Sequence, residues 1–486
     1  MDNKHFVAID AGSSKIALAV GYEIDGNFSV NYYKTIPSIG ISKGRVQNVQ
    51  HASDAIRSLL NDAKNELELD IKCAVANFPN YPIQQVECIS KIDRDDTIVR
   101  REDIDILIKN AEQDAVEKAT EQGKMIVYDC VAQSYSDGYD FQIAEDDIEG
   151  RFCEMIEGNF LVCLGKENPV NILDNTLGMS DLTPIKKYFT PQLAGRMVLD
   201  KSDRENGVAL VDIGGNVTSV SIFTGDILRY FDSIPFGGNN ITSDIRQECG
   251  ISEGLAENIK KAYGICCPNR LLNMGDKSLR IKLKDATRTK EVWVKYISEI
   301  VTARMEEIFE AVLYMIEKSG FSDELRSGIV LTGGGAMLCN CTKLLSEMSG
   351  YSIRLGKIRK RFGNMPPECL QTDAVNCLSM LYAARELQQV QFVYDPNEPR
   401  ITAIDNESTE NVFNPMTVEE KPRPVESTFR SNKFFSRENK VRKPTEEKAV
   451  SPQKPNFIGK IMDKVLDTDE EKSEKKADQL FNDSLF

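Results

Sequence analysis

Residues 7–15 read VAIDAGSSK, residues 208–218 read VALVDIGGNVT and residues 328–336 read GIVLTGGGA. Each stretch is a short apolar run followed by a turn rich in glycine or serine, which predicts a buried strand that ends in a tight turn. Such a turn brings backbone N–H groups close to a phosphate because no Cβ atom stands in the way. Asp10 and Asp212 stand just before two of these turns, where a carboxylate can hold a divalent metal through water. Together the stretches predict two turns that grip a phosphate chain and its metal, and a third that closes over the nucleoside.

Length and charge limit the classes of protein to consider. The chain has 486 residues, which is too many for one ordinary core and predicts two or more domains. Its formal net charge is −15 and its isoelectric point is near 5.0. Because a general nucleic-acid binder needs a basic face, we expect no nucleic-acid partner.

Cysteine and histidine usage argues against several kinds of site. The chain has 12 cysteines but no C-x-x-C pair, and its two histidines are His5 and His51. A Cys/His zinc site and a histidine-dependent hydrolase are therefore both disfavoured, and we expect reduced, mostly buried thiols. The first residues lack the basic and apolar segments of a signal peptide, and no apolar run approaches the roughly 18 residues of a spanning helix.

The strand pattern of the opening residues recurs later in the chain. Strands predicted at Phe6–Asp10 and Ile16–Tyr22 are matched by strands at Val208–Asp212 and Val217–Phe223. Strands and helices alternate as in an α/β domain, except from Ile83 to about Leu161, where the segment is more charged and reads as an inserted small α+β module. Such a duplication is typical of a two-lobed fold that holds a nucleotide between its lobes.

Three further stretches identify a family resemblance. Residues 207–223, the segment DSIPFGGNNITSDI at 232–245 and the segment AENIKKAYG at 256–264 resemble the FtsA family of bacterial cell-division proteins, and the similarity covers about residues 5–390. The resemblance implies a two-lobed actin-like ATPase with a duplicated ribonuclease H-like fold. FtsA-like chains also have an inserted subdomain, called 1C, where the second actin subdomain would otherwise lie.

The resemblance also implies the domain boundaries. We expect subdomain 1A at 1–82 and 162–200 with a return helix at about 371–390, subdomain 1C at 83–161, subdomain 2A at 201–224 and 311–370, subdomain 2B at 225–310, a disordered linker at 391–455, an amphipathic helix at 456–466 and an acidic tail at 467–486.

Site residues follow from the resemblance residue by residue, with ATP and Mg²⁺ as the implied cofactors. The first phosphate turn would comprise Asp10, Gly12, Ser13, Ser14 and Lys15, and the second Asp212, Gly214, Gly215, Asn216 and Val217. Asp10 and Asp212 would hold the magnesium through waters. The nucleoside would meet Gly333, Gly334, Gly335 and Met337, and the ribose would meet Glu257 and Lys260.

The second turn departs from the family pattern. The family reads Asp-Ile-Gly-Gly-Gly-Thr-Thr-Asp there, whereas residues 212–219 read DIGGNVTS. Asn216 replaces the third glycine, and asparagine tolerates a left-handed backbone better than most residues, so the turn can survive. The loss of the threonine hydroxyl and the carboxylate is expected either to weaken phosphate contact or to slow hydrolysis. Gln192 is the candidate for positioning an attacking water, and the sequence predicts ATP binding with at most slow ATPase activity.

The C-terminal region has a different composition. Eight of the 18 prolines fall between Pro396 and Pro455, in a stretch without hydrophobic periodicity, which predicts a disordered linker. Residues 456–466 then read NFIGKIMDKVL, a pattern of an interfacial amphipathic helix, although a packing or partner-docking segment has the same pattern. The resemblance favours membrane targeting, while the acidic run after residue 466 would oppose an anionic surface. The predicted apolar face consists of Phe457, Ile458, Ile461, Met462 and Val465.

The resemblance implies a peripheral protein on the cytoplasmic face of the inner membrane at the division site. It would polymerise, tether the tubulin-like FtsZ through the FtsZ C-terminal segment and recruit later division proteins. The FtsZ contact is expected within 225–310, around a helix at Trp293–Lys318. Two alternatives stay open. A sugar or small-acid kinase of the same fold would need a catalytic aspartate, for which the sequence offers no obvious candidate. A pilus-assembly actin homologue would have the insertion but not the tail.

Overall fold

The structure is a computed structural model, and it describes residues 4–119, 123–271, 277–282, 289–358 and 362–394. The amphipathic helix predicted at 456–466 and the acidic tail lie outside these residues, as does the predicted linker from residue 395 onward. None of the described helices combines the length and the apolar character that crossing a bilayer requires.

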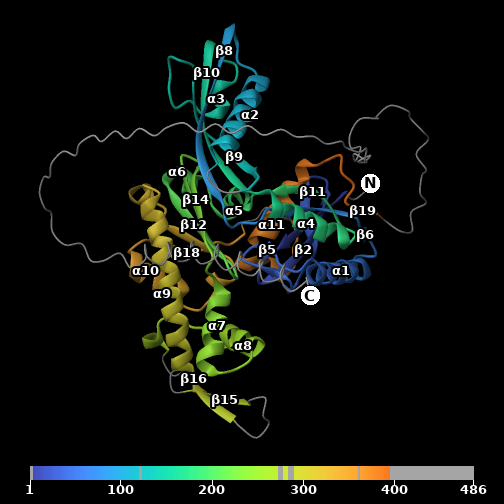
Figure 1. Ribbon diagram of the computed structural model, residues 1–486, viewed down its shortest axis with the longest axis vertical. Coiled ribbons are helices and arrows are strands. Elements are labelled where there is room, and N and C mark those ends of the chain that lie inside the picture. Colours follow the sequence, from blue (N-terminus) through green and yellow to red (C-terminus); the bar gives the residue numbers. More distant parts are fainter. Residues whose placement is uncertain (1–3, 120–122, 272–276, 283–288, 359–361, 395–486) are drawn as a thin grey trace, which may run out of the picture. The chain divides into compact units, whose positions relative to one another are not determined.

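Two five-stranded sheets form the framework, and they have the same strand order. The first runs from edge to edge as β3 (Asn27–Pro37), β2 (Lys15–Ile24), β1 (Lys4–Ala11), β7 (Cys73–Asn77) and β11 (Thr183–Tyr188). The second runs as β14 (Ile227–Ile234), β13 (Thr218–Thr224), β12 (Val208–Ile213), β17 (Ile329–Thr332) and β18 (Ile353–Leu355). In each sheet the first three strands are antiparallel and the last two run parallel to the central strand. The predicted duplication is therefore confirmed (Figure 1).

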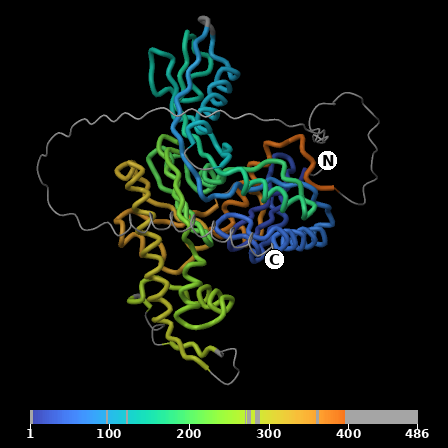
Figure 2. Tube along the Cα trace, in the orientation of Figure 1, coloured from blue at the N-terminus to red at the C-terminus, as the bar shows by residue number. Residues whose placement is uncertain are grey.

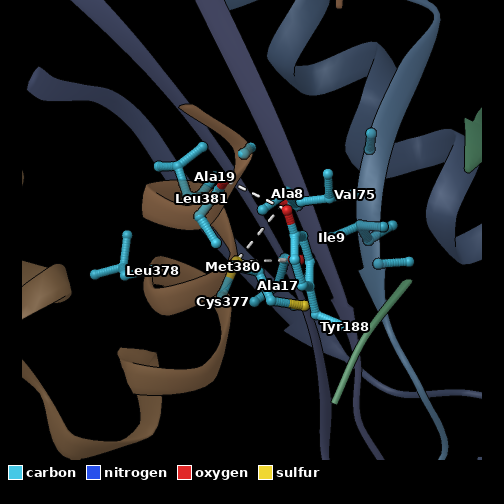
Figure 3. Close-up of a cluster of buried hydrophobic side chains, with 14 of the residues drawn as sticks. Ala8, Ile9, Ala17, Ala19, Val75, Tyr188, Cys377, Leu378, Met380 and Leu381 are labelled. Atoms are coloured by element: carbon cyan, nitrogen blue, oxygen red, sulfur yellow. Dashed lines mark hydrogen bonds between the residues drawn. The ribbon is translucent and has the colours of Figure 1, made fainter. Parts of the chain in front are cut away.

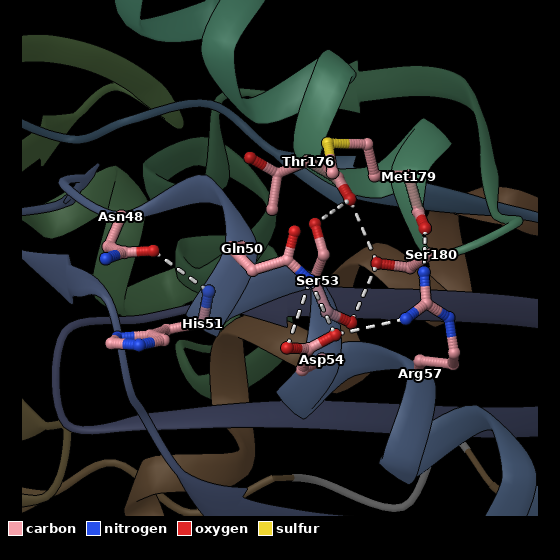
Figure 4. Close-up of polar contacts among 9 residues, drawn as sticks. All are labelled: Asn48, Gln50, His51, Ser53, Asp54, Arg57, Thr176, Met179 and Ser180. Atoms are coloured by element: carbon pink, nitrogen blue, oxygen red, sulfur yellow. Dashed lines mark hydrogen bonds and ion pairs between the residues drawn. The ribbon is translucent and has the colours of Figure 1, made fainter.

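Helix α1 (Val49–Leu67) covers the first sheet and packs against α4 (Glu167–Met179). The side chain of Asn48 caps α1 by accepting a hydrogen bond from the His51 N–H at 3.0 Å. Polar groups fasten the two helices together (Figure 4): the Ser53 hydroxyl donates to the Thr176 carbonyl at 3.0 Å, and the Ser180 hydroxyl donates to the Ser53 carbonyl at 3.1 Å. These bonds satisfy buried polar atoms where the helices meet.

The chain returns to the first sheet near the end of its described part, through α11 (Val375–Ala383), which also packs against α5 (Thr190–Val198). Alanines on β1 and β2 let this helix approach closely (Figure 3). The Cys377 thiol lies 3.7 Å from the Ala8 carbonyl and 3.8 Å from the Ala17 carbonyl. Residues beyond α11 also belong to this core, because Phe392 is buried against Phe6. The folded region therefore includes positions 391–394, where the linker was expected to begin.

The insertion has a sheet and a core of its own. Its strands, in sheet order, are β8 (Gln84–Ile98), β10 (Phe152–Lys166) and β9 (Met125–Ser136), and its helices are α2 (Arg101–Lys118) and α3 (Glu145–Ile148). Buried side chains of α2, including Ile104 and Leu107, pack within this module. β10 is one continuous 15-residue strand, so the module extends past the boundary predicted at residue 161.

A second set of elements is inserted between β14 and β17 (Figure 2, green to yellow). It contains α7 (Gly238–Cys249), α8 (Glu253–Tyr263), β15 (Ser278–Lys282), β16 (Thr289–Trp293) and the 25-residue α9 (Val294–Lys318). The remaining short elements are β4 (Ile41–Ser42), β5 (Arg45–Val46), β6 (Asp70–Ile71), α6 (Lys201–Asn206), α10 (Cys341–Ser349), β19 (Val393–Tyr394) and the 3-10 turns η1 (Pro268–Arg270), η3 (Ser322–Glu324), η4 (Gly335–Met337), η5 (Pro367–Leu370), η6 (Thr372–Ala374) and η7 (Ala384–Glu386).

Direct contacts join the two duplicated halves. Phe189, which precedes α5, packs edge-to-face on Phe231 of β14 with ring centroids 4.9 Å apart. The insertion also reaches the second sheet, because the Gln85 side chain accepts from the Phe231 N–H at 2.8 Å and the Gln133 side chain donates to the Leu228 carbonyl at 3.0 Å. β14 is therefore attached both to the first half and to the insertion.

We expect Phe231→Ala to lower the free energy of unfolding by about 3–5 kcal/mol, because it leaves a cavity under Phe189 in a fully buried position. Urea denaturation followed by circular dichroism measures this change. Tyr139→Ala is the control, since that side chain is 84% exposed and its loss should change stability by less than about 0.5 kcal/mol. Equal effects of the two substitutions would contradict this account of how the halves are joined.

Candidate functional site

The first two glycine turns have the same construction. Each closes a strand hairpin, β1–β2 or β12–β13, with a hydrogen bond across the turn. The Gly12 N–H donates to the Lys15 carbonyl at 3.1 Å, and the Gly214 N–H donates to the Val217 carbonyl at 2.9 Å. A Cβ atom at either glycine would lie within 2.9 Å of the accepting oxygen. These turns therefore require glycine for a close backbone approach.

The two turns touch each other. A Cβ atom on Gly215 would lie 2.7 Å from the Ser14 Cβ and 3.1 Å from the Ser14 nitrogen. The N-terminus of α7 rests on the same second turn: the Gly238 N–H donates to the Gly214 carbonyl at 2.9 Å, and the Asn239 N–H donates to the Gly215 carbonyl at 2.7 Å. The predicted phosphate segments, about 200 residues apart in the chain, thus meet at one place.

Asn216, the departure from the family pattern, is held by a side-chain contact. The Asn239 amide donates to the Asn216 side-chain oxygen at 2.9 Å. Asn216 is not one of the described residues that have a left-handed backbone. The expectation that asparagine is tolerated there because of a left-handed conformation is therefore wrong, and the Asn239 bond is what fixes the side chain.

Two acidic side chains lie beside the turns. The pKa of Asp10 is raised to about 6, chiefly by burial and also by the Asp212 and Asp373 charges, against the opposing charge of Lys15. Burial also raises the pKa of Asp212, against the hydrogen bond that the Asn376 amide donates to its carboxylate at 2.8 Å. Burial destabilises the charged form of these carboxyl groups, and a divalent cation bound beside them would stabilise it. The donor set therefore suits the predicted magnesium.

Lys15 begins β2 and is already engaged. Its ammonium lies 2.5 Å from the Asp373 carboxylate, and it lies 3.4 Å from the Tyr33 hydroxyl. Ser13 is engaged as well, since its hydroxyl accepts from the Gly44 N–H at 2.7 Å, whereas Ser14 is exposed. Of these polar side chains, Ser14 is the one that faces solvent.

Glu257 and Lys260 lie one turn apart on α8 and form an ion pair at 2.7 Å. The Lys260 ammonium also donates to the Gly238 carbonyl at 2.9 Å and to the Thr242 hydroxyl at 2.8 Å, so all three of its N–H groups have partners. Burial tends to raise the pKa of Glu257, but the Lys260 charge holds it below its ordinary value; burial lowers the pKa of Lys260. Lys260 thus ties α8 to the start of α7, and a ribose contact from it would require one of these bonds to break.

The third turn follows β17 and lies against the second. Gly333 has a left-handed φ of +83°, and a side chain there would collide with the Asp212 carboxylate. A Cβ on Gly335 would likewise collide with Ile213, while Gly334 has more room and Met337 is 48% exposed. The turn is linked to the end of α8, because the Cys339 N–H donates to the Gly264 carbonyl at 3.3 Å.

The sixteen predicted nucleotide-site residues therefore lie at three turns and on α8. The second turn contacts both the first and the third, and α8 is joined to the start of α7 and, at its end, to the segment after the third turn. Gln192 lies half-buried on α5, which packs against α11, and its role stays a prediction. Four residues at the site were not found by sequence reasoning: Asn239, Thr242, Asp373 and Asn376. The first two lie in the stretch quoted for the resemblance, but no glycine pattern surrounds the last two.

Comparisons with known proteins bear on the family and the fold of the chain. The model of the family described as "Cell division protein FtsA" matches residues 209–376. A cell division protein FtsA of Neisseria meningitidis serogroup B is 26% identical over 388 residues, covering 79% of this chain and 91% of that protein. One of Pseudomonas aeruginosa is 27% identical over 355 residues, covering 73% and 83%.

The chain is a homologue of the FtsA proteins. Among solved structures, a chain of the PilM–PilN type IV pilus biogenesis complex superposes with a TM-score of 0.57 at 15% identity, covering 78% of this chain and 98% of that one. At this identity the likeness shows the fold alone, and it confirms the predicted actin-like fold class. The FtsA relatives support a cell-division actin-like protein.

Gly237→Ala tests the close contact between the start of α7 and the second turn. The added methyl group would collide with the backbone oxygens of Gly214 and Gly215, so we expect a loss of about 1–3 kcal/mol of stability and at least about tenfold weaker Mg-ATP binding. Thermal melting and calorimetry measure the two effects. Gly254→Ala is the matched control on α8, because no atom lies within 4 Å of its added methyl group. An alanine at position 237 that behaves like the control would show that the turn has room to spare.

Asp10→Asn tests the electrostatics of the metal-free protein. The folded-state pKa of Asp10 lies above its ordinary value of 3.8, so wild-type stability decreases as pH rises from about 4 through 6. In EDTA we expect the variant to exceed wild type by up to about 3 kcal/mol at pH 8 and to lose this advantage near pH 4. Melting curves across this pH range measure the difference.

Asp93→Asn is the control for that series, since this side chain is 88% exposed. It should give no gain at pH 8. A gain for Asp10→Asn that does not change between pH 8 and pH 4 would contradict a buried, ionisable Asp10.

Proposed function

We propose that this chain is an ATP-binding, polymerising cell-division protein that lies at the cytoplasmic face of the inner membrane and anchors the FtsZ ring there. The observation that supports ATP binding most directly is the contact between two matched glycine turns, each next to a half-buried aspartate. The FtsA relatives support the cellular role.

Phosphate binding would use groups from both halves. The backbone N–H groups around Ser14 and Gly215 are close enough to meet one phosphate chain, because these turns are in contact. Asp10 and Asp212 would hold Mg²⁺ through water, and the ion would supply positive charge to the phosphates when bound. A ligand that engages both turns is stabilised only when the halves keep this arrangement, so binding would favour one relative position of the halves.

Nucleoside binding would fall to α8 and the third turn. Glu257 projects from α8, where Lys260 and the Thr242 hydroxyl hold its carboxylate. Gly334 has room around its Cα, and Met337 exposes its side chain on η4. These residues would accommodate the ribose and the base. Gln192 would position water for slow hydrolysis, and the nucleotide would act mainly as an assembly switch.

Membrane attachment would use the predicted helix at 456–466. Five apolar side chains on one face give only a few kcal/mol after the costs of ordering, so a single chain would bind weakly. A polymer presents many such helices, and their combined binding is stronger by avidity. Polymerisation and membrane binding would therefore depend on each other. FtsZ would bind the elements within 225–310, and later division proteins would follow.

The two alternatives gain less support. The likeness to the PilM chain concerns the fold, whereas the sequence relatives quoted above are cell division proteins. No finding favours a kinase over a binding protein.

Liposome co-sedimentation tests the proposal on the purified protein. We expect the full chain to pellet with vesicles containing anionic lipid when Mg-ATP is present, and to pellet several-fold less without it. A chain truncated after Lys454 should stay in the supernatant. Within the full chain, Ile461→Asn should abolish pelleting while Asp463→Asn should not, because the two positions lie on opposite faces of the predicted helix.

Pelleting that ignores both the tail and ATP would contradict the membrane-tethered polymer. If every variant stays in solution with ATP bound, a phosphoryl acceptor becomes the better hypothesis, and the kinase alternative is tested next.

A further inference from the structure

A five-residue segment contacts all three glycine turns. Thr372 exchanges two hydrogen bonds with Gly333 of the third turn, at 3.2 Å from the Gly333 N–H and at 2.9 Å to the Gly333 carbonyl. Asp373 pairs with Lys15 of the first turn at 2.5 Å. Asn376 donates to Asp212, beside the second turn, at 2.8 Å. The segment spans η6 and the first residues of α11.

Buried residues hold this segment in place. The residue after Asn376 is Cys377, which is fully buried against β1 and β2 (Figure 3). Ala374 and Val375 are buried as well. The backbone of the segment is therefore fixed, and its polar side chains have little freedom to follow the turns if these move.

Asp373 and a phosphate chain would need the same cation. The Lys15 side chain is 23% exposed and that of Asp373 is 26% exposed, so the pair is only partly screened by solvent. Lys15 is also the side chain of the first turn that is suited to a charge-assisted bond with phosphate. A triphosphate bound at this turn must either draw the ammonium away from Asp373 or share it with a carboxylate of like charge.

We propose that Asp373 is a positioning residue that competes with nucleotide phosphates for Lys15 and thereby lowers the affinity of the site for triphosphates. The inference rests on the proposed ATP binding. Because Asp373 and Asn376 share one segment, release of Lys15 frees one of three attachments to the turns and leaves the other two in place. Asp373 therefore sets how strongly the site distinguishes a nucleotide from its nucleoside.

The test compares ATP with adenosine, which lacks phosphates, by isothermal titration calorimetry in Mg²⁺. We expect Asp373→Asn to bind ATP about tenfold more tightly than wild type, the size that one partly screened charge contributes, and to bind adenosine within twofold of wild type. A merely structural role would change both ligands alike. Asp62→Asn is the matched control, because it removes the partner of Lys34 from an exposed pair at 2.9 Å.

A second experiment, in a Lys15→Met variant, distinguishes competition for Lys15 from simple repulsion between Asp373 and the phosphates. In Lys15→Met, Asp373→Asn should improve ATP affinity less than about threefold, since the contested cation is gone. An undiminished gain in that background would overturn competition for Lys15. Asp373→Ser serves as a second variant if Asp373→Asn melts early, and the same ratio of affinities is expected from it.

The remaining outcomes distinguish this inference from the proposed function. A wild-type protein that binds ATP, together with an Asp373→Asn variant whose ATP-to-adenosine ratio is unchanged, would overturn the inference alone. A folded wild-type protein that binds neither ligand would overturn the proposed ATP binding and this inference together.

Discussion

The contact between the two glycine turns is the constraint on which the rest of the arrangement depends. Ser14 and Gly215 approach so closely that a side chain at position 215 would collide with Ser14. This approach requires β1 and β12 to deliver their turns to one place, and the contacts of Phe189 with Phe231 and of α5 with α11 hold the halves in that register. The N-terminus of α7 then rests on the second turn through two backbone hydrogen bonds. The close approach of the two turns therefore depends on packing between the two duplicated halves.

The fold class could be predicted because its signals are local. The apolar runs before Gly12 and Gly214 form central strands in both sheets, and their repetition reveals the duplication. Boundaries were harder, since they depend on tertiary contacts. β10 continues to Lys166 because it pairs with β9 from Glu157 to Lys166, which no periodicity in the strand itself could indicate. Phe392 belongs to the core because it meets Phe6, which is almost 400 residues earlier in the chain.

The residues of the candidate site also include some that could be predicted from the sequence and others that could not. Glycine and aspartate in a strand–turn pattern could be recognised from the sequence, because the chemistry of phosphate and metal requires those residue types. Asp373 and Asn376 could not be recognised, since each acts on a partner at least 160 residues away and neither lies in a glycine-rich pattern. Lys260 was found, but its partners were not: its ammonium serves the Gly238 carbonyl and the Thr242 hydroxyl. Sequence patterns thus identified the turns that come together, while the side chains that hold those turns emerged only from the structure.

Charge explains why this site would respond to a nucleotide and a cation together. Asp10, Asp212 and Asp373 surround the turns with three carboxylates, and Lys15 is the cation among them. Burial and mutual repulsion raise the pKa of Asp10, so the metal-free site is electrostatically strained at neutral pH. A triphosphate alone would add to this negative charge, whereas a divalent cation would relieve it. A bound cation would therefore strengthen the binding of the phosphates. The phosphate oxygens would in turn coordinate the cation directly, which the two carboxylates, acting through water, do not. By reciprocity, each strengthens the binding of the other.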